Sequence, residues 1–244
     1  AEEELSSNAF FFGGNGYLLN GFSASAGNYH VVKVMDEDGN VSYEFKDRFE
    51  RLVLSKQVVN GAYYCTYYAY DNAGNLIYVL PPLLSEVWET DLVINDTNDS
   101  MQKYAYIYRY DGLNRCIYKK LPGCDPVYYI YDKGGRLIFS QDGEQRLRGE
   151  WAFTIPDVFG RTVLSGTCKN SLTYTAAPLK DVLVKATWGN VTNRYMGYTL
   201  TGITLTTPVI LSATYYDNYD FISKNSVPST LAYTAASGYG VRSV

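Results

Sequence analysis

The sequence has almost no histidine, no closely paired cysteines and no long apolar run, and each of these gaps excludes a class of protein. Its 244 residues contain one histidine, His30. The four cysteines are Cys65, Cys116, Cys124 and Cys168. They form no C-x-x-C pair, so the usual spacing of a zinc site is missing. No apolar run approaches the ~18 residues of a membrane-spanning helix. We therefore expect no metal, no cofactor and no membrane span.

An excess of positive charge is also missing. The chain has 21 basic and 25 acidic side chains, which gives a net charge of −4. Proteins that bind nucleic acid need a basic surface to match the phosphates, so we expect no nucleic-acid partner. The first residues, AEEELSSNAFFFGG, lack the cationic start of a secretion signal, so any such signal is expected to have been removed or to lie outside this sequence.

The scattered cysteines do not suggest a disulfide framework. Buried thiols are the ordinary interpretation of isolated cysteines. A disulfide between Cys116 and Cys124, across one hairpin, is the alternative in an oxidising compartment.

Tyrosine is abundant. The chain has 25 Tyr against 10 Phe and 3 Trp. Tyrosine favours β-strands, and its ring suits a half-buried sheet face because one end is apolar and the other polar. The composition therefore favours an all-β protein.

A short motif recurs along the chain: Asp, then Gly three residues later, then Asn or Arg, then an apolar or β-branched residue. Six copies begin at Asp36, Asp47, Asp71, Asp111, Asp132 and Asp157. The fourth position is occupied in turn by Gly39, Glu50, Gly74, Asn114, Gly135 and Gly160. Asn tolerates a left-handed backbone, so Asn114 fits the motif, whereas Glu50 departs from it. Six copies indicate an internal repeat.

The physical reading of each copy is a β-hairpin. In YYIYDKGGRLIFS (128–140) alternating residues flank the motif on both sides, as in two paired strands. The Asp side chain can accept backbone N–H groups of the turn, and Gly can adopt the positive φ of a bulge. Because a catalytic Asp would not be expected in six near-copies, we interpret these residues as structural.

Three copies are preceded by Tyr: YDNAGNL (70–76), YDGLNR (110–115) and YDKGGRL (131–137). They resemble the YD repeats of the Rhs family, whose motif is Tyr-Asp-x-x-Gly-Arg-Leu. The resemblance covers about residues 31–166, is close to bacterial cell-envelope or secreted members, and extends to the segment that follows. It implies a long, curved sheet of stacked hairpins, which in complete members forms a shell around cargo or an adhesive ectodomain.

Three copies lack the preceding Tyr, those at Asp36, Asp47 and Asp157. Lys46 stands before Asp47 and Pro156 before Asp157. Proline cannot donate a ladder hydrogen bond, so the strand of Pro156 is expected to be an edge or an interrupted strand.

We expect three segments: an N-terminal segment (1–30), the hairpin sheet (31–166) and a β-rich C-terminal extension packing on it (167–244). A short helical insertion is expected near 83–89, followed by a polar loop over 95–100. The stretch YDNYD, which begins at Tyr216, has no Gly, and we interpret it as a chance likeness to the motif.

One set of tyrosines is the candidate binding face. By strand alternation the following residues precede the turns and form that set: Tyr68, Tyr70, Tyr108, Tyr110, Tyr129 and Tyr131. They either pair across strands as structural ladders or leave an open row of rings for glycans or another chain. The edges of such a sheet could also mediate self-association.

The sequence thus predicts an all-β antiparallel protein without enzymatic activity. Its expected role is a structural or interaction segment of a secreted or surface-exposed bacterial YD-repeat protein, forming part of a β-sheet wall or shell. The alternative is a carbohydrate- or protein-binding module. A glycoside hydrolase is the remaining alternative, and it would need two carboxylates facing each other in a cleft.

Overall fold

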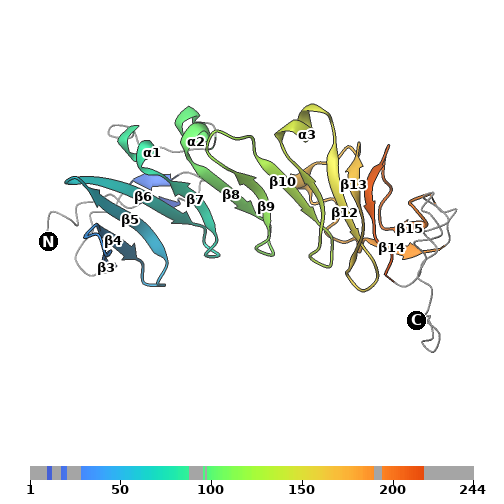
Figure 1. The fold of residues 1–244 in the computed structure, drawn as a ribbon, viewed down its shortest axis with the longest axis horizontal. Helices are drawn as coiled ribbons and strands as arrows, with labels where there is room; N and C mark the ends of the chain where they lie inside the picture. The colour runs from blue at the N-terminus through green and yellow to red at the C-terminus, as the bar shows by residue number, and fades with distance from the viewer. Residues whose placement is uncertain are drawn as a thin grey trace. The chain divides into compact units, whose positions relative to one another are not determined.

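The computed structural model describes residues 10–12, 18–20, 29–87, 96, 98–189 and 194–216. This part of the chain is antiparallel sheet with short helices, which confirms the predicted all-β fold with a small helical insertion (Figure 1). None of its helices is long and apolar enough to cross a lipid bilayer. The chain divides into two compact units, Ala1–Pro126 and Val127–Val244. This boundary falls inside the repeat region rather than at its end.

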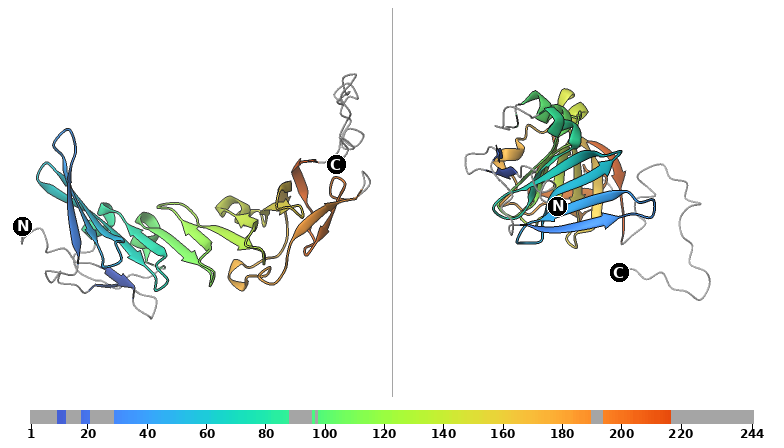
Figure 2. Two further views of the ribbon diagram at one scale, coloured as in Figure 1. Left: turned by 90° about the horizontal axis from the view of Figure 1, so that it is seen from below. Right: turned by 90° about the vertical axis from the view of Figure 1, so that its left-hand side faces the viewer.

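The first unit is built on seven strands that follow one another in chain order. They are β3 (His30–Met35), β4 (Val41–Lys46), β5 (Leu52–Val59), β6 (Ala62–Tyr70), β7 (Leu76–Leu80), β8 (Tyr106–Tyr110) and β9 (Cys116–Lys120). Each pairs antiparallel with the next. A separate pair, β1 (Phe10–Phe12) with β2 (Leu18–Asn20), belongs to the same unit. Figure 2 shows the progressive twist from β3 to β9, which strand chirality imposes on sheets.

Two helices connect β7 to β8. α1 (Pro82–Val87) begins at a proline, which is tolerated in the first turn because its missing N–H would have no helical partner there. α2 (Asp99–Tyr104) begins after Asn98, whose side chain accepts hydrogen bonds from the backbone N–H groups of Ser100 and Met101. The expected polar loop over 95–100 is therefore wrong at its C-terminal end. Of the expected helix, residues 88 and 89 lie outside the described part.

The core of the first unit lies between its sheet and this helical connection. Tyr78, Leu80 and Ile107 of the sheet are fully buried, as are Leu84 of α1 and Met101 of α2. Both helices lie at the strand ends opposite the β6–β7 and β8–β9 turns (Figure 1). One sheet face is thus apolar, and the insertion packs against it through Leu84 and Met101.

The second unit continues the hairpin pattern. Its strands are β10 (Val127–Tyr131), β11 (Leu137–Gln141), β12 (Trp151–Pro156), β13 (Thr162–Cys168) and β16 (Val209–Ala213), in this spatial order. α3 (Gly143–Leu147) joins β11 to β12 and begins at a capping box, because Asp142 accepts from the Gln145 N–H and the Gln145 side chain accepts from the Asp142 N–H.

The segment between β13 and β16 folds onto the sheet of this unit. It contains the 3₁₀ turn Tyr174–Ala176 and the hairpin of β14 (Lys185–Trp188) and β15 (Tyr198–Thr201). Leu179, Val184 and Ala186 are buried together with Ile138 and Phe153 of the sheet. One face of the sheet is therefore covered by this segment.

Pro156 does not lie in an edge strand. β12 is paired on one side with β11 and on the other with β13. Pro156 is the last residue of β12, at the point where the register with β13 shifts between Ile155 and Pro156. Of the two expected alternatives, the edge strand is wrong and the interrupted strand is confirmed, because a bulge, like an edge, releases one residue from donating to the ladder.

The four cysteines form no disulfide. Cys168 is buried and Cys124 is exposed, while Cys65 and Cys116 are half-buried. The alternative of a Cys116–Cys124 disulfide is thus wrong, and burial does not extend to Cys124. Burial raises the pKa of the Cys168 thiol.

Candidate functional site

The six repeat turns share one hydrogen-bonded geometry. In each, one carboxylate oxygen of Asp accepts the backbone N–H four residues later, at 2.8–3.0 Å. The other oxygen accepts the side chain at that same position, which is Asn in two copies and Arg in four. The backbone closes the loop again, from the fourth residue of the motif to the Asp carbonyl. Each Asp carboxylate therefore accepts hydrogen bonds from its own loop.

The fourth position of every copy has positive φ. The glycines Gly39, Gly74, Gly135 and Gly160 have φ between 75° and 87°. Asn114 and Glu50 both have φ of 60°. The departure at Glu50 therefore leaves the shape of the turn unchanged, although a Cβ is strained in this conformation.

We expect Glu50→Gly to stabilise the protein by about 1 kcal/mol, because it removes this strain at the cost of some unfolded-state entropy. The ion pair that is lost, 3.7 Å between Glu50 and His30, is largely exposed and contributes little. Urea denaturation measures the change. Asn114→Gly is the matched control and should give a smaller gain, and a loss of stability in Glu50→Gly would contradict the strain.

The turn carboxylates are held in their ionised form. At Asp111, burial opposes ionisation, but hydrogen bonds from the Arg115 side chain and from the Arg115 and Leu113 N–H groups outweigh it and lower the pKa. The pKa of Asp47 and Asp157 is lowered by the same balance.

A lowered folded-state pKa contributes stability above the unfolded value of about 3.9, and this contribution is lost as the pH falls through the folded value. We therefore expect the free energy of unfolding to decline as the pH falls below about 4. Asp111→Asn should be less stable than the wild type at pH 7, and the difference should shrink on acidification. Urea denaturation between pH 7 and pH 3 measures both chains, and parallel curves would contradict the lowered pKa.

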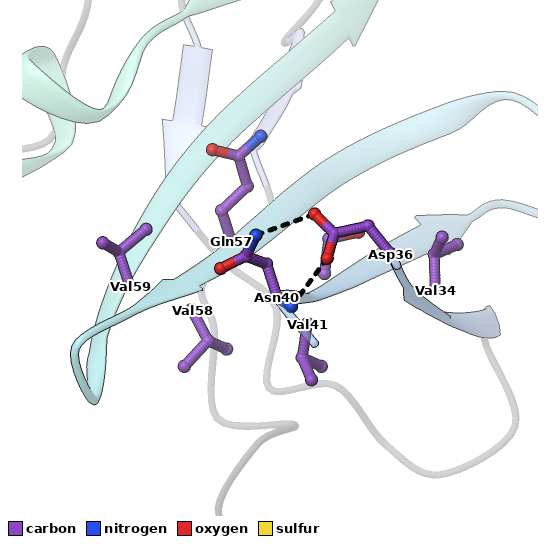
Figure 3. Close-up of a pocket in the computed structure, with 8 residues that line it drawn as sticks. Val34, Asp36, Asn40, Val41, Gln57, Val58 and Val59 are labelled. Atoms are coloured by element: carbon purple, nitrogen blue, oxygen red, sulfur yellow. Dashed lines mark hydrogen bonds between the residues drawn. The ribbon is translucent and has the colours of Figure 1, made fainter. Parts of the chain in front are cut away.

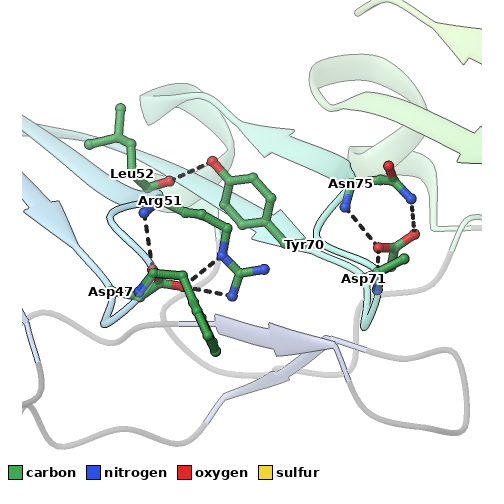
Figure 4. Close-up of polar contacts among 8 residues, drawn as sticks. Asp47, Arg51, Leu52, Tyr70, Asp71 and Asn75 are labelled. Carbon is green, nitrogen blue, oxygen red and sulfur yellow. Dashed lines mark hydrogen bonds and ion pairs between the residues drawn. The ribbon is translucent and has the colours of Figure 1, made fainter. Parts of the chain in front are cut away.

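A tyrosine from the next repeat fastens each of two turns in the first unit. The Tyr70 hydroxyl donates to the Leu52 carbonyl at 3.0 Å, and the Arg51 guanidinium lies over its ring, 4.8 Å from the centroid (Figure 4). The Tyr110 hydroxyl donates to the Leu76 carbonyl at 3.1 Å. In both cases the acceptor is the first residue after the preceding turn, so Tyr joins one repeat to the one before it.

Of the stretch YDNYD, only Tyr216 lies within the described part of the chain. The Tyr216 hydroxyl donates to the Thr162 carbonyl at 3.2 Å, and the Arg161 guanidinium lies 4.4 Å from its ring centroid. Thr162 is the first residue after the Asp157 turn. Tyr216 thus makes the two contacts that Tyr70 makes. The other residues of the stretch lie outside the described part of the chain, so its interpretation as a chance likeness stays a prediction.

The Asp132 turn binds a second segment of the chain. The Asp132 side chain is fully buried, although its Arg136 partner is one-quarter exposed. One oxygen of Asp132 accepts the Val184 N–H at 3.2 Å, and Arg136 donates to the Val184 carbonyl at 2.5 Å. Lys133 donates its N–H to the Val182 carbonyl at 2.9 Å. This turn therefore anchors the segment that covers the second unit.

The six tyrosines of the candidate binding face are all half-buried: Tyr68, Tyr70, Tyr108, Tyr110, Tyr129 and Tyr131. Tyr68 and Tyr70 alternate with the buried Ala69, so they lie on the face opposite the core. Tyr70 and Tyr110 are engaged in the contacts between repeats. The hydroxyls of Tyr68 and Tyr108 make no hydrogen bond to any described residue.

Asp36 lies apart from the other turns of its unit, because the β3–β4 turn is at the opposite strand ends from the β4–β5 turn. A pocket of ≈ 350 Å³ adjoins it (Figure 3). Valines form half of its lining, and the polar side chains of Asp36, Asn40, Ser42 and Gln57 form the other half. The Asn40 side chain first, and then its backbone N–H, hold the pKa of Asp36 below its usual value. Its carboxylate therefore serves its turn here as well.

One polar cluster of the first unit has no signal in the sequence. The Tyr78 hydroxyl donates to Asp96 at 2.6 Å, and Arg109 donates to the same carboxylate at 2.5 Å. Arg109 also lies over the Tyr78 ring, 4.7 Å from its centroid. Lys120 donates to the carbonyl of Gln102 in α2. The cluster fastens the helical insertion to the sheet.

The described residues contain no group of three or more His, Cys, Asp or Glu side chains that could hold a metal ion. The comparisons with known proteins add little. No protein-family model and no curated protein matches the sequence. A crystal structure of TcdB2–TccC3 without its hypervariable C-terminal region is 14% identical with a TM-score of 0.43, covering 62% of this chain and 7% of that chain. A Photorhabdus luminescens Tc holotoxin pore with a mutated TccC3 is 13% identical with a TM-score of 0.44, covering 70% and 8%. This chain thus spans less than a tenth of those chains.

Proposed function

We propose that the chain is a non-catalytic wall segment: a run of YD-type hairpins that forms part of the β-sheet of a larger, Rhs-like bacterial protein, secreted or exposed at the cell surface. The observation that supports this proposal most is that the repeated residues contact one another. Asp47 accepts hydrogen bonds within its own turn. Arg51 of that turn donates to Asp47 and lies over the ring of Tyr70, and the Tyr70 hydroxyl donates to the Leu52 carbonyl just after the turn. Residues that recur in this way serve the sheet itself.

The distribution of carboxylates supports the non-catalytic role. A glycoside hydrolase places two carboxylates about 5–10 Å apart across an open cleft. Each turn carboxylate here is instead bonded within its own loop, where at least three donors occupy it in five of the six copies. In the remaining copy, Asp132 also accepts from Arg136 and Val184.

One observation favours a second role as a binding module. Tyr68 and Tyr108 present half-buried rings on the face opposite the core, and their hydroxyls have no hydrogen-bond partner among the described residues. Such rings are suited to stack on sugars or to pack against another protein surface.

We expect Tyr70→Phe to lower the free energy of unfolding by about 1 kcal/mol, since it removes one half-buried hydrogen bond between repeats. Tyr64→Phe on the same strand is the matched control, because the Tyr64 ring is exposed and its hydroxyl makes no hydrogen bond to a described residue. Chemical denaturation of both variants measures the difference. Equal free energies of unfolding in the two variants would mean that the contact between Tyr70 and Leu52 does not support the proposed wall segment.

A glycan array and a panel of chromogenic glycosides distinguish the three roles. The wall segment should neither bind glycans nor release sugar. Glycan binding that is lost in both Tyr68→Ala and Tyr108→Ala would establish the binding module instead. Hydrolysis of a glycoside by the purified protein that is lost on a single Asp or Glu substitution would establish the hydrolase.

A further inference from the structure

The pocket beside Asp36 lies where two hairpins of the first unit adjoin. Its lining residues come from β3, the β3–β4 turn, the start of β4 and the end of β5 (Figure 3). Its volume of ≈ 350 Å³ is near the lower end of the range of about 300–1,000 Å³ that is usual for ligand sites. The pocket therefore has room for one or two side chains of a partner.

Strand register places polar and apolar side chains next to one another at this pocket. Ser42 is directly opposite both Val34 and Gln57. Gln57 is in turn opposite Tyr64. Because directly opposite residues share one face of a sheet, these four side chains form a row across β3, β4, β5 and β6. The Ser42 hydroxyl and the Gln57 amide make no hydrogen bond to any described residue, so both are free to bind a partner.

The apolar side chains of this surface are exposed. Val34 is 44% exposed, Val59 is 47% exposed and Tyr64 is 39% exposed. The pocket lining itself includes neither an aromatic nor a basic side chain. Exposed apolar side chains that gather at a pocket are typical of an interaction surface.

The β3–β4 turn places negative charge beside the pocket. It contains Asp36, Glu37 and Asp38 and no basic residue. Among the described residues, no Lys, Arg or His forms an ion pair with any of these three carboxylates. The other five turns have a single carboxylate each, except that the Asp47 turn has two carboxylates together with two arginines. The uncompensated charge is therefore specific to the β3–β4 turn.

Two of these three carboxylates are free to meet a cation. Asp36 accepts hydrogen bonds from the Asn40 side chain and from the N–H groups of Asp38 and Asn40, so it is engaged in the turn. The side chains of Glu37 and Asp38 make no hydrogen bond to any residue that the structure describes. A basic group that approaches the pocket would thus find two unpaired acceptors beside it.

The chemistry of the surface selects one class of partner. Its negative charge repels the phosphates of nucleic acids and of anionic lipids. Its aliphatic pocket lacks the flat rings that stack on sugars.

We propose that the pocket and the β3–β4 turn bind a segment of another protein in which apolar side chains flank a lysine or an arginine. The apolar side chains pack on Val34 and Val59, and the basic group pairs with Glu37 and Asp38. This inference uses contacts of the first unit alone and does not depend on the role as a wall segment.

Three labelled pentapeptides test the proposal by fluorescence anisotropy with the full-length chain. Leu-Lys-Val-Lys-Leu has both expected features, Leu-Glu-Val-Glu-Leu has the opposite charge, and Ser-Lys-Ser-Lys-Ser lacks the apolar side chains. We expect the first peptide to bind most tightly. Absence of its binding, or equal binding of all three peptides, would overturn the proposal.

The charged part of the surface is tested by the double variant Glu37→Gln with Asp38→Asn, which leaves the acceptor Asp36 in place. Glu144→Gln, which changes an exposed carboxylate of the second unit, is its matched control. We expect the double variant to bind Leu-Lys-Val-Lys-Leu roughly fivefold more weakly at about 50 mM salt and the difference to shrink at about 500 mM. Equal losses in the double variant and the control would overturn the assignment of the charge.

The apolar part is tested by the double variant Val34→Ser with Val59→Ser, and Val158→Ser, at a valine that is 57% exposed in the second unit, is its control. We expect the double variant to weaken binding of the same peptide roughly fivefold at both salt concentrations, because apolar contact is lost. Unchanged binding would overturn the assignment of the pocket. Light scattering should give a monomer, and self-association that the double variant abolishes would also overturn the proposal, because a second copy would then occupy the surface.

Discussion

Asp132→Ala should be the most destabilising of the six Asp→Ala substitutions in the turns, with an expected loss of about 3 kcal/mol. The side chain is fully buried, and its removal leaves the Val184 N–H without its acceptor and takes one of its acceptors from Arg136. Because Val184 belongs to the covering segment, the loss should also loosen that segment. Denaturant unfolding measures the first effect, and faster hydrogen exchange over 179–188 measures the second.

Two other aspartates serve as controls for this result. Asp111 makes the same turn without a second segment, and a smaller loss of about 1–2 kcal/mol is expected there. Asp36 is fully exposed, so Asp36→Ala should shift the unfolding midpoint least. An equal loss in Asp132→Ala and Asp36→Ala would show that the contact with Val184 contributes nothing.

Gly166→Ala should separate β16 from β13. A Cβ on Gly166 would lie 2.1 Å from the Val209 carbonyl oxygen and 2.9 Å from the Phe153 ring. A carbonyl of the paired strand cannot rotate away, so the strands must move apart, and overpacking of this kind costs about 1–3 kcal/mol or more. Faster exchange throughout β16, together with a lower unfolding midpoint, is the expected observation.

Substitutions of two further glycines separate steric overlap from backbone strain as the cause of this loss of stability. Gly160 has φ of +85° and open space around its Cβ position, so Gly160→Ala reports backbone strain alone, about 1 kcal/mol. Gly112 has open space and no positive φ, so Gly112→Ala should be neutral. If Gly166→Ala proves no worse than Gly160→Ala, the close approach of β16 to β13 is not as tight as its backbone positions indicate.

Some features that the sequence analysis missed were nevertheless present in the sequence. Asp142 followed by Gln145 is a capping-box pattern, and it marks the start of α3. Asn98 before α2 is a helix N-cap of the usual type. Both were missed because the helices are short and interrupt a strongly β-like repeat.

Other features could not be predicted from the local sequence. Asp132 and Val184 are 52 residues apart, and nothing near either residue indicates that they meet. The cluster of Tyr78, Asp96 and Arg109 is likewise assembled from three separate segments. Such contacts depend on how the connecting segments fold back on the sheet, which is decided by the burial of side chains from both.

The sequence by itself determined the hairpins, since the turn contacts of Asp and the positive φ of the fourth residue are made within five consecutive residues. Strand alternation likewise determined which tyrosines share a face. Only the tertiary structure decided which turn is buried and which face is covered. These outcomes rest on contacts between residues far apart in the chain, where the free energy of packing, rather than local backbone preference, selects the arrangement.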